Sequence, residues 1–346
     1  MLKNKFIITL ILIFTLLISS FSFVACGKEG SGGSDDNAQS ATGYIDLGLY
    51  PQSDVTATMA ANLSSYTSIK PTASNTNGWS SFKFFQNSNN ETDFAWYKDI
   101  EFSENIYRAV YFSEYRPSST AALSSEVNSY QDDNGYSIGK VYIFKFEPIT
   151  WRKTALVDGK TIIVAEKILD CKEFNSSTSN KTVNGTNIYA NNYEHSGIRS
   201  WLNTSFYDTA FNESQRALIS ETSVSNGAKS TNPDGGEQWN GGANAYASGY
   251  TQDKVYLLSV QEATKEEYGF STEHSANNAT RRKNPTDYAR CLGLETFNGY
   301  SNWWLRSSYY FYNNFSWRVS FGGDLVNANG IVNTCRGIVP VLRVSL

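Results

Sequence analysis

VYIFKF, residues 141–146, is typical of the runs that indicate the fold class of this chain. It is short and rich in β-branched and aromatic residues, which favour a strand over a helix. Comparable runs recur along the chain, and Ser-, Asn- and Gly-rich stretches such as 175–191 and 227–249 form long loops. Short strands among irregular loops predict an α+β fold with few helices. The predicted strands are Tyr107–Phe112 (YRAVYF), Val141–Phe146, Thr161–Ala165 (TIIVA) and Lys254–Ser259 (KVYLLS).

One region, Ser196–Ser220, has a clear helical pattern, with apolar residues at helical spacing in its first half. In its second half, Asn212 stands three residues before Gln215 and ahead of an apolar run, which predicts the capped start of a second helix. We interpret these helices as core-packing elements and not as sites. Shorter helices are predicted at Glu262–Tyr268 and Thr286–Cys291.

The first 25 residues have the pattern of an export signal. Lys3 and Lys5 precede a mostly apolar run, which ends in small residues before Cys26. Small residues before a Cys resemble the lipobox of bacterial lipoproteins, in which the Cys receives a lipid and becomes the mature N-terminus; Phe23 stands where that family prefers Leu. The alternative is a transmembrane anchor, but the run is short for a bilayer core of about 30 Å. We therefore expect residues 1–25 to be a lipoprotein signal peptide.

Residues 26–43 are predicted to be a flexible, lipid-anchored linker, because Gly, Ser and Asp dominate them. Residues 44–346 then form a single domain tethered through the lipid on Cys26 to the bacterial cell envelope, on its outer surface. The chain has 33 acidic and 29 basic residues, and its one basic cluster is residues 281–283. This balance gives little support for a nucleic-acid partner.

Three cysteines remain if Cys26 carries a lipid: Cys171, Cys291 and Cys335. They allow at most one disulfide within the chain, and the sequence leaves the choice of pair open. No CxxC pattern and no His/Cys cluster is present, so we expect no zinc or other metal site and no cofactor.

The C-terminal stretch SSYYFYNNFSWRVSFGGDLVNANGIVNT, residues 307–334, is crowded with Tyr, Phe and Asn. From Ser301 to Leu346 there is no Lys, Glu, Gln, Met or His. An aromatic core is one interpretation. However, four consecutive rings at residues 309–312 are hard to bury together on a strand, and Asn313 and Asn314 would need buried partners. We expect most of this cluster to be exposed, in a composition similar to that of antibody paratopes.

Ordered landmarks along nearly the whole chain resemble a bacterial exported domain catalogued as a domain of unknown function. The resemblance implies a C-type-lectin-like fold of the formylglycine-generating-enzyme type. It places Trp303, Trp304, Leu305, Val341 and Leu342 in the framework, and Val339 replaces an Arg that is usual in the terminal motif. The landmarks are LGLYPQS (47–53), WYKDIEF (96–102), YRAVYF, FEPITWRK (146–153), EKILDCKEFN (166–175), NYEHSGIRSWLNTSFYDTAF (192–211), DKVYLLS (253–259), NWWLRS (302–307) and GIVPVL (337–342).

A narrower resemblance is to variable proteins of this fold that are diversified by a retroelement, including the Treponema variable lipoproteins. Their mutagenesis replaces adenines, so an Asn codon cannot become Lys, Glu, Gln, Met or Trp. Between Tyr309 and Arg336 only Trp317 lies outside the reachable set. This would explain four of the five missing residue types, while the missing His remains unexplained. The resemblance implies a variable region at about residues 307–336.

The predicted function is therefore a surface-displayed lipoprotein that binds a protein or cell-surface ligand through a diversified C-terminal face. Arg306 is assigned to scaffold hydrogen bonding. One alternative is a lectin-like module that binds glycans without Ca²⁺. A Ca²⁺ site is not expected, because Asp324 is the one side-chain carboxylate in the C-terminal stretch. An oxidase of the formylglycine-generating type is less favoured, because it would need a close pair of reactive cysteines and Cys335 has no Cys near it in the sequence. Arg318 and Asp324 could be taken as a catalytic pair, but charged residues on a loop are weak evidence for catalysis. The predicted contact residues, with no catalytic role, are Tyr310, Tyr312, Asn313, Asn314, Phe315, Trp317, Phe321, Asp324, Asn327, Asn329 and Asn333.

Overall fold

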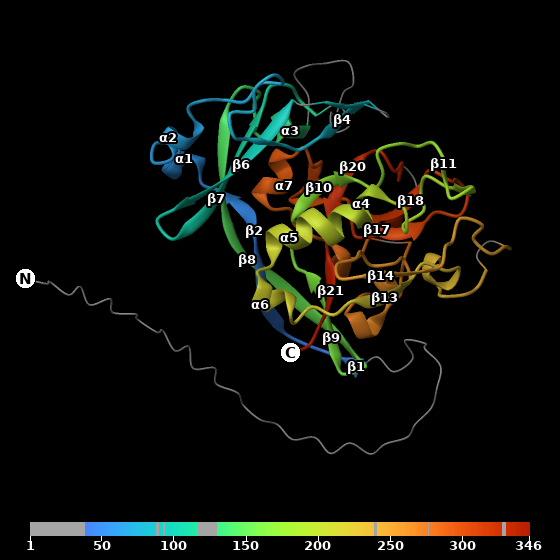
Figure 1. Cartoon of the computed structure of the whole chain (residues 1–346). Helices are drawn as coiled ribbons and strands as arrows, with labels where there is room; N and C mark the ends of the chain where they lie inside the picture. Colours follow the sequence, from blue (N-terminus) through green and yellow to red (C-terminus); the bar gives the residue numbers. More distant parts are fainter. Residues whose placement is uncertain are drawn as a thin grey trace, which may run out of the picture. The chain divides into compact units, whose positions relative to one another are not determined.

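The computed structural model describes residues 39–87, 90–92, 94–116, 130–238, 241–275, 277–326 and 330–346, and for 85–87 and 90–92 the backbone alone. The described residues form one compact unit (Figure 1). Cys26, the predicted signal and most of the predicted linker lie outside them. Gln39 and Ser40, near the end of that linker, pair with Leu156 and Ala155. Strand pairing thus already begins five residues before the predicted domain boundary at Tyr44.

The larger of two main sheets is antiparallel and is built around one strand of 17 residues, β8 (Figure 1). The first half of β8 pairs with β7 and its second half with β9, while β2 pairs across the middle. The sheet order is β21-β9-β8-β7-β6-β3, with β1 and β2 also on β8. Its strands are β1 (Gln39–Ser40), β2 (Tyr44–Asp54), β3 (Ser80–Ser81), β6 (Ala95–Phe102), β7 (Asn105–Phe112), β8 (Val141–Val157), β9 (Lys160–Ala165) and β21 (Val341–Val344).

The second sheet has five short strands in the order β10-β20-β17-β18-β19. They are β10 (Asp170–Glu173), β17 (Trp303–Ser308), β18 (Ser316–Val319), β19 (Leu325–Val326) and β20 (Cys335–Ile338). Four further pairs are β4 (Phe84–Asn87) with β5 (Asn90–Thr92), β11 (Lys181–Val183) with β12 (Thr186–Ile188), β13 (Thr222–Ser225) with β14 (Tyr250–Asp253), and β15 (Thr296–Phe297) with β16 (Tyr300–Ser301).

The helices are short; α4 to α7 lie in segments where the sequence predicts helices, whereas α1, α2 and α3 were not predicted. Ser196 and Thr286 cap α4 and α7 with their side chains, and Asn212 and Gln215 form a complete capping box at α6. α7 contacts β2 of the larger sheet and β10 of the second. In the described part of the chain no helix is long and apolar enough to cross a membrane. The α-helices are α1 (Thr56–Met59), α2 (Ser64–Thr67), α3 (Tyr130–Asp133), α4 (Gly197–Trp201), α5 (Tyr207–Ala210), α6 (Glu213–Arg216) and α7 (Asp287–Cys291), with a π-turn η2 (Leu202–Phe206) and 3₁₀ turns η3 (Lys229–Thr231), η4 (Glu262–Thr264), η5 (Glu266–Tyr268) and η6 (Ala279–Arg281).

Strands thus outnumber helices in a mixed α+β fold, as predicted. Three of the four predicted strands lie in β7, β8 and β9, but the fourth prediction, Lys254–Ser259, is wrong. In this buried segment Tyr256 makes an isolated bridge to Val341. The carbonyls of Val255, Leu257 and Leu258 are bonded individually, for example Leu257 O by the Arg306 guanidinium at 2.7 Å. A continuous apolar run buried on all sides does not need a partner strand when side chains satisfy its backbone.

The core includes the five residues that the family resemblance places in the framework. Trp303, Trp304, Leu305, Val341 and Leu342 are all fully buried. β17 therefore lies inside the molecule, and its C-terminal end emerges at Tyr309, where the candidate site begins.

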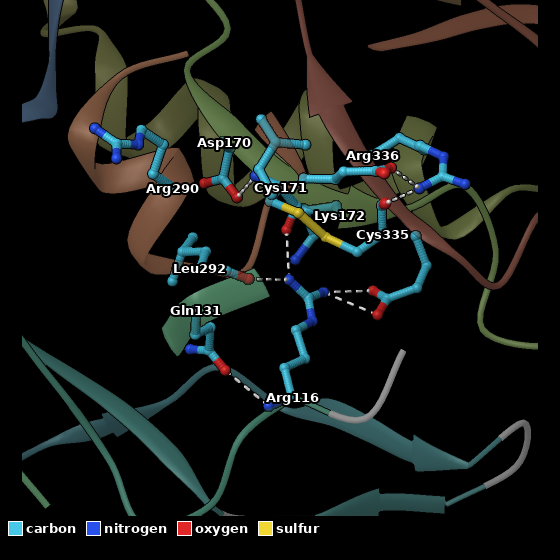
Figure 2. The surroundings of a disulfide bond; sticks show 12 residues. Arg116, Gln131, Asp170, Cys171, Lys172, Arg290, Leu292, Cys335 and Arg336 are labelled. Carbon is cyan, nitrogen blue, oxygen red and sulfur yellow. Dashed lines mark hydrogen bonds and ion pairs between the residues drawn. A yellow bond between two sulfur atoms is a disulfide. The ribbon is translucent and has the colours of Figure 1, made fainter. Parts of the chain in front are cut away.

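A disulfide joins Cys171 on β10 to Cys335 on β20, which leaves Cys291 as a buried thiol (Figure 2). Arg116, which is fully buried, donates from Nη2 to both carboxylate oxygens of Glu173 at 2.8 Å. Its Nη1 donates to Cys171 O at 2.8 Å and to Leu292 O at 3.0 Å, as Figure 2 shows. Cys335 closes the predicted variable region, but the disulfide makes it a framework residue.

Candidate functional site

The loop Tyr309–Phe315 connects β17 to β18 and contains five of the predicted contact residues. Its ends close on each other, because Tyr309 N donates to Phe315 O at 2.9 Å. On one flank it lies against residues 330–332, where Val332 N donates to Asn314 O at 3.1 Å. The main chain of the loop is therefore held at both ends and along one side.

Asn191 holds the other side of this loop. Its side chain is fully buried, and Nδ2 lies 3.3 Å from Tyr309 O and 2.9 Å from both Tyr312 O and Phe315 O. Its backbone N–H donates to Asn313 O at 2.9 Å. Since one amide group has two hydrogens, three carbonyls share them. The loop is thus fixed through main-chain carbonyls, which are present whatever side chains the loop carries.

Rings from the loop pack around Tyr309, which is 8% exposed. Its ring lies 5.5 Å from those of Phe311 and Trp317, 5.8 Å from Tyr310 and 6.3 Å from Tyr312. Burial, together with Tyr310 and Tyr312, raises the pKa of the Tyr309 phenol. Edge-to-face contacts of this kind stabilise a cluster beyond the area that it buries. Tyr309 is therefore the buried centre of this ring cluster, and the other rings pack against it.

The exposed side chains of this loop are Phe311, at 53%, and Tyr312, at 57%. Phe311 is absent from the predicted contact residues. Residues 309–315 form a turn, so neighbouring side chains do not alternate between two faces as they would on a strand. The partly buried members of the predicted set in and beside this loop are Tyr310, Asn313, Asn314, Phe315 and Asn333.

The prediction that Trp317 is a contact residue is wrong, because Trp317 lies on β18 and its side chain is only 2% exposed. Its indole stands edge-on to Tyr309, with an interplanar angle of 88°. A side chain in that position supports the ring cluster from beneath and is not a contact residue.

Phe321 and Asp324 lie at the opposite end of β18 from the loop. Trp303 pairs with Val319 and Ser308 with Ser316, so residues 320–324 and 309–315 occupy the two ends of one hairpin. At ~3.3 Å per residue, the strand between them is about 10 Å long. Asn327 and Asn329 lie outside the described residues. The predicted contact residues therefore form two groups and not one face.

The second group has its own aromatic pair. The ring of Phe321, 37% exposed, lies 4.9 Å from that of Phe297, 55% exposed, on β15. Asp324 accepts a hydrogen bond from the Ser320 hydroxyl. Gly323 has a φ of +87°, and a Cβ there would lie 1.9 Å from Asn278 O, so this turn requires glycine.

Charged residues near β18 serve the framework. Arg306 is assigned correctly to scaffold bonding: it is buried, forms an ion pair with Glu262 and donates to the carbonyls of Leu257 and Ser225. Burial alone would raise the pKa of Glu262, but Arg306 outweighs it and lowers that pKa. Burial, and secondly the nearby Arg336, lower the pKa of Arg318 to about 10. Arg318 donates to Asn302 Oδ1 at 2.6 Å.

The predicted contact residues of the loop Tyr309–Phe315 lie on an open surface. A cleft of about 460 Å³ lies among residues 233–235, 261, 264–267 and 272, and none of the predicted contact residues lines it. Among the described residues, no three His, Cys, Asp or Glu side chains are grouped to hold a metal ion. The chemistry that this face offers is aromatic contact and amide hydrogen bonding.

Comparison with known proteins identifies one family. A family described as "Domain of unknown function (DUF6273)" matches residues 158–346, more than half of the chain. The match includes β9, the second sheet and the loop Tyr309–Phe315. No curated protein and no solved structure matches the chain. The chain belongs to the DUF6273 family.

Proposed function

We propose that this protein is a surface-displayed lipoprotein that binds a protein or cell-surface ligand through the loop Tyr309–Phe315. The observation that carries the proposal is the pairing of exposed rings with a fixed main chain. Phe311 and Tyr312 are more than half exposed, while Asn191 bonds the carbonyls beneath them. Rigid aromatic side chains on a preorganised loop give large contact area at low entropy cost.

We propose further that the fold is C-type-lectin-like and that the region of about 307–336 is diversified. The fold proposal rests on the sequence landmarks, of which NWWLRS contains most of β17 and leads into the exposed loop. The diversification proposal is supported by the placement of residues 310–314 on a loop whose main chain is held from outside it. Side chains there can change without removing the bonds that Asn191 makes.

The proposed location is the bacterial cell envelope, with a lipid on Cys26 as the membrane anchor. The Cys171–Cys335 disulfide supports export, because disulfides persist in oxidising compartments and are rare in the cytosol. Both cysteines are buried, so the bond is structural.

Binding by the mature chain to intact cells tests the function. Phe311→Ala combined with Tyr312→Ala is expected to weaken binding at least about tenfold, as loss of central aromatic contacts does. Phe297→Ala is the matched control, since it removes an equally exposed ring at the other end of the hairpin. Thermal unfolding confirms that each variant is folded. Equal binding by the double variant and the wild type would refute the proposed face.

A further inference from the structure

Two tyrosines from other loops lie beside the aromatic loop. Tyr189 follows β12, and Tyr246 lies in the long connection before β14. Their ring centroids are 4.8 Å apart with an interplanar angle of 78°, an edge-to-face contact between segments 57 residues apart in sequence. Both side chains are partly buried, and neither was among the predicted contact residues.

Hydrogen bonds join the segment of Tyr246 to Ser308, at the start of the loop, and the segment of Tyr189 to the loop through Asn191. The Ser308 hydroxyl, one residue before the loop, donates to Tyr246 O at 3.0 Å. Asn244 Nδ2 donates to Ser308 O, also at 3.0 Å. Tyr189 stands two residues before Asn191, whose side chain bonds the loop carbonyls. Three segments distant in sequence are therefore fixed together at the end of β17.

These three segments carry no formal charge. Residues 187–191, 241–251 and 309–317 contain no Asp, Glu, Lys, Arg or His. Glu237, which lies close to Tyr310 and Asn244, forms an ion pair with Lys229 at 3.4 Å, and both side chains are exposed. Charge complementarity therefore favours a partner whose contact surface is uncharged.

The surface is also shallow beside the loop. The hollow between Tyr310, Asn244 and neighbouring residues has a volume of about 10 Å³. That is room for about one water molecule. A hollow of this size cannot enclose a ligand, so a partner must lie across the open face, as a protein surface does.

We propose that Tyr189 and Tyr246 form, with the loop Tyr309–Phe315, one continuous binding face, and that its partner is an uncharged patch on a folded protein. This inference rests on the proposed function and deepens it. Tyr189 and Tyr246 lie outside the region of about 307–336, so they are the fixed part of a face whose remainder varies. Tyr189 and Tyr246 contact every ligand in the same way, and the side chains of the loop determine which ligand is bound.

The test uses the mature chain on two printed arrays, one of folded proteins and one of glycans. Tyr189→Ala with Tyr246→Ala, and Phe311→Ala with Tyr312→Ala, are each expected to weaken binding to protein spots about tenfold or more. Phe297→Ala leaves it unchanged. Tyr246→Lys keeps a side chain of similar length, adds a charge to the face and is also expected to weaken binding. Wild-type binding is expected to change little between about 0.1 and about 1 M salt.

The outcomes separate this inference from the proposed function. Loss of binding in the Phe311/Tyr312 variant alone would overturn the inference and leave the proposed function standing. Binding to neither array, or binding that neither double variant weakens, would overturn both. Binding to the glycan array instead, or a steep fall with salt, would overturn the assignment of an uncharged protein partner. Thermal unfolding of every variant confirms that a loss of binding is not a loss of fold.

Discussion

Lys283 is a buried residue whose charge depends on its surroundings. Its side chain is 2% exposed, and Nζ lies 3.1 Å from Glu166 Oε2. Burial lowers the pKa of Lys283 to about 8; Glu166 acts against that shift and Arg152 adds to it. A lysine with a lowered folded pKa loses its proton more easily in the folded state than in the unfolded chain.

The free energy of unfolding should therefore depend on this residue at alkaline pH. Between pH 8 and about 10 the unfolded chain binds more protons at Lys283, so the stability contributed by this position rises with pH. Lys283→Met is expected to be the more stable protein at pH 7, and its advantage should shrink by about 2 kcal/mol as the pH rises to about 10. Denaturant unfolding of both proteins across this range measures the difference.

Lys229→Met provides the control, because the Lys229 side chain is 63% exposed. Its difference from the wild type should stay constant over the same range. A constant difference for Lys283→Met as well would mean that Lys283 is solvated and that its environment differs from the one described.

At the scale of elements, the loop Tyr309–Phe315 depends on Asn191 from another part of the chain. Asn191→Ala removes the donor shared by three loop carbonyls. Phe315 O keeps the Tyr309 N–H as donor and Tyr312 O keeps the Phe315 N–H, so Tyr309 O is the carbonyl most affected. A buried carbonyl without a partner costs about 1–3 kcal/mol, and the variant is expected to lose about that much unfolding free energy. Hydrogen exchange should accelerate at the amides of Tyr309 and Phe315, which are bonded within the loop.

Two further variants separate hydrogen bonding from packing. Asn191→Asp keeps the shape of the side chain but cannot donate, so it should be at least as damaging as Asn191→Ala. Asn180→Ala removes an exposed acceptor of Asn313 Nδ2 and should change stability by less than about 0.5 kcal/mol. A protected loop in Asn191→Ala would show that its shape does not require Asn191.

The sequence predicted those elements whose signals are local. The capping box of Asn212 and Gln215 lies within four residues, and β7, β8 and β9 contain dense β-branched and aromatic runs. Asn191, in contrast, bonds residues 118 to 124 positions away, and the disulfide closes a separation of 164. No local pattern encodes such contacts. Trp317 was misassigned for a related reason, because composition could not distinguish a strand that faces the core from the exposed loop before it.

At the scale of the whole molecule, fixed and exposed positions alternate within the C-terminal stretch. Cys335 is bonded to Cys171, Trp317 is buried under Tyr309, and Gly323 occupies a turn that excludes a Cβ. Between these fixed points, Phe311 and Tyr312 project from a loop held by its main chain. The proposed variable region of about 307–336 is thus a mixture of framework and display positions.

If this region is diversified, substitutions should follow that division. Copies of the gene from independent isolates should differ at residues 310–314 and keep Trp317, Gly323 and Cys335, because changes there cost a buried ring, a steric clash or the disulfide. Sequencing the gene and its neighbourhood measures this and should also find a near-identical template repeat, with adenines at the variable codons, beside a reverse transcriptase. An invariant loop without a template would rule out diversification. Substitutions that are as frequent at Trp317, Gly323 and Cys335 as at residues 310–314 would instead contradict the division into framework and display positions.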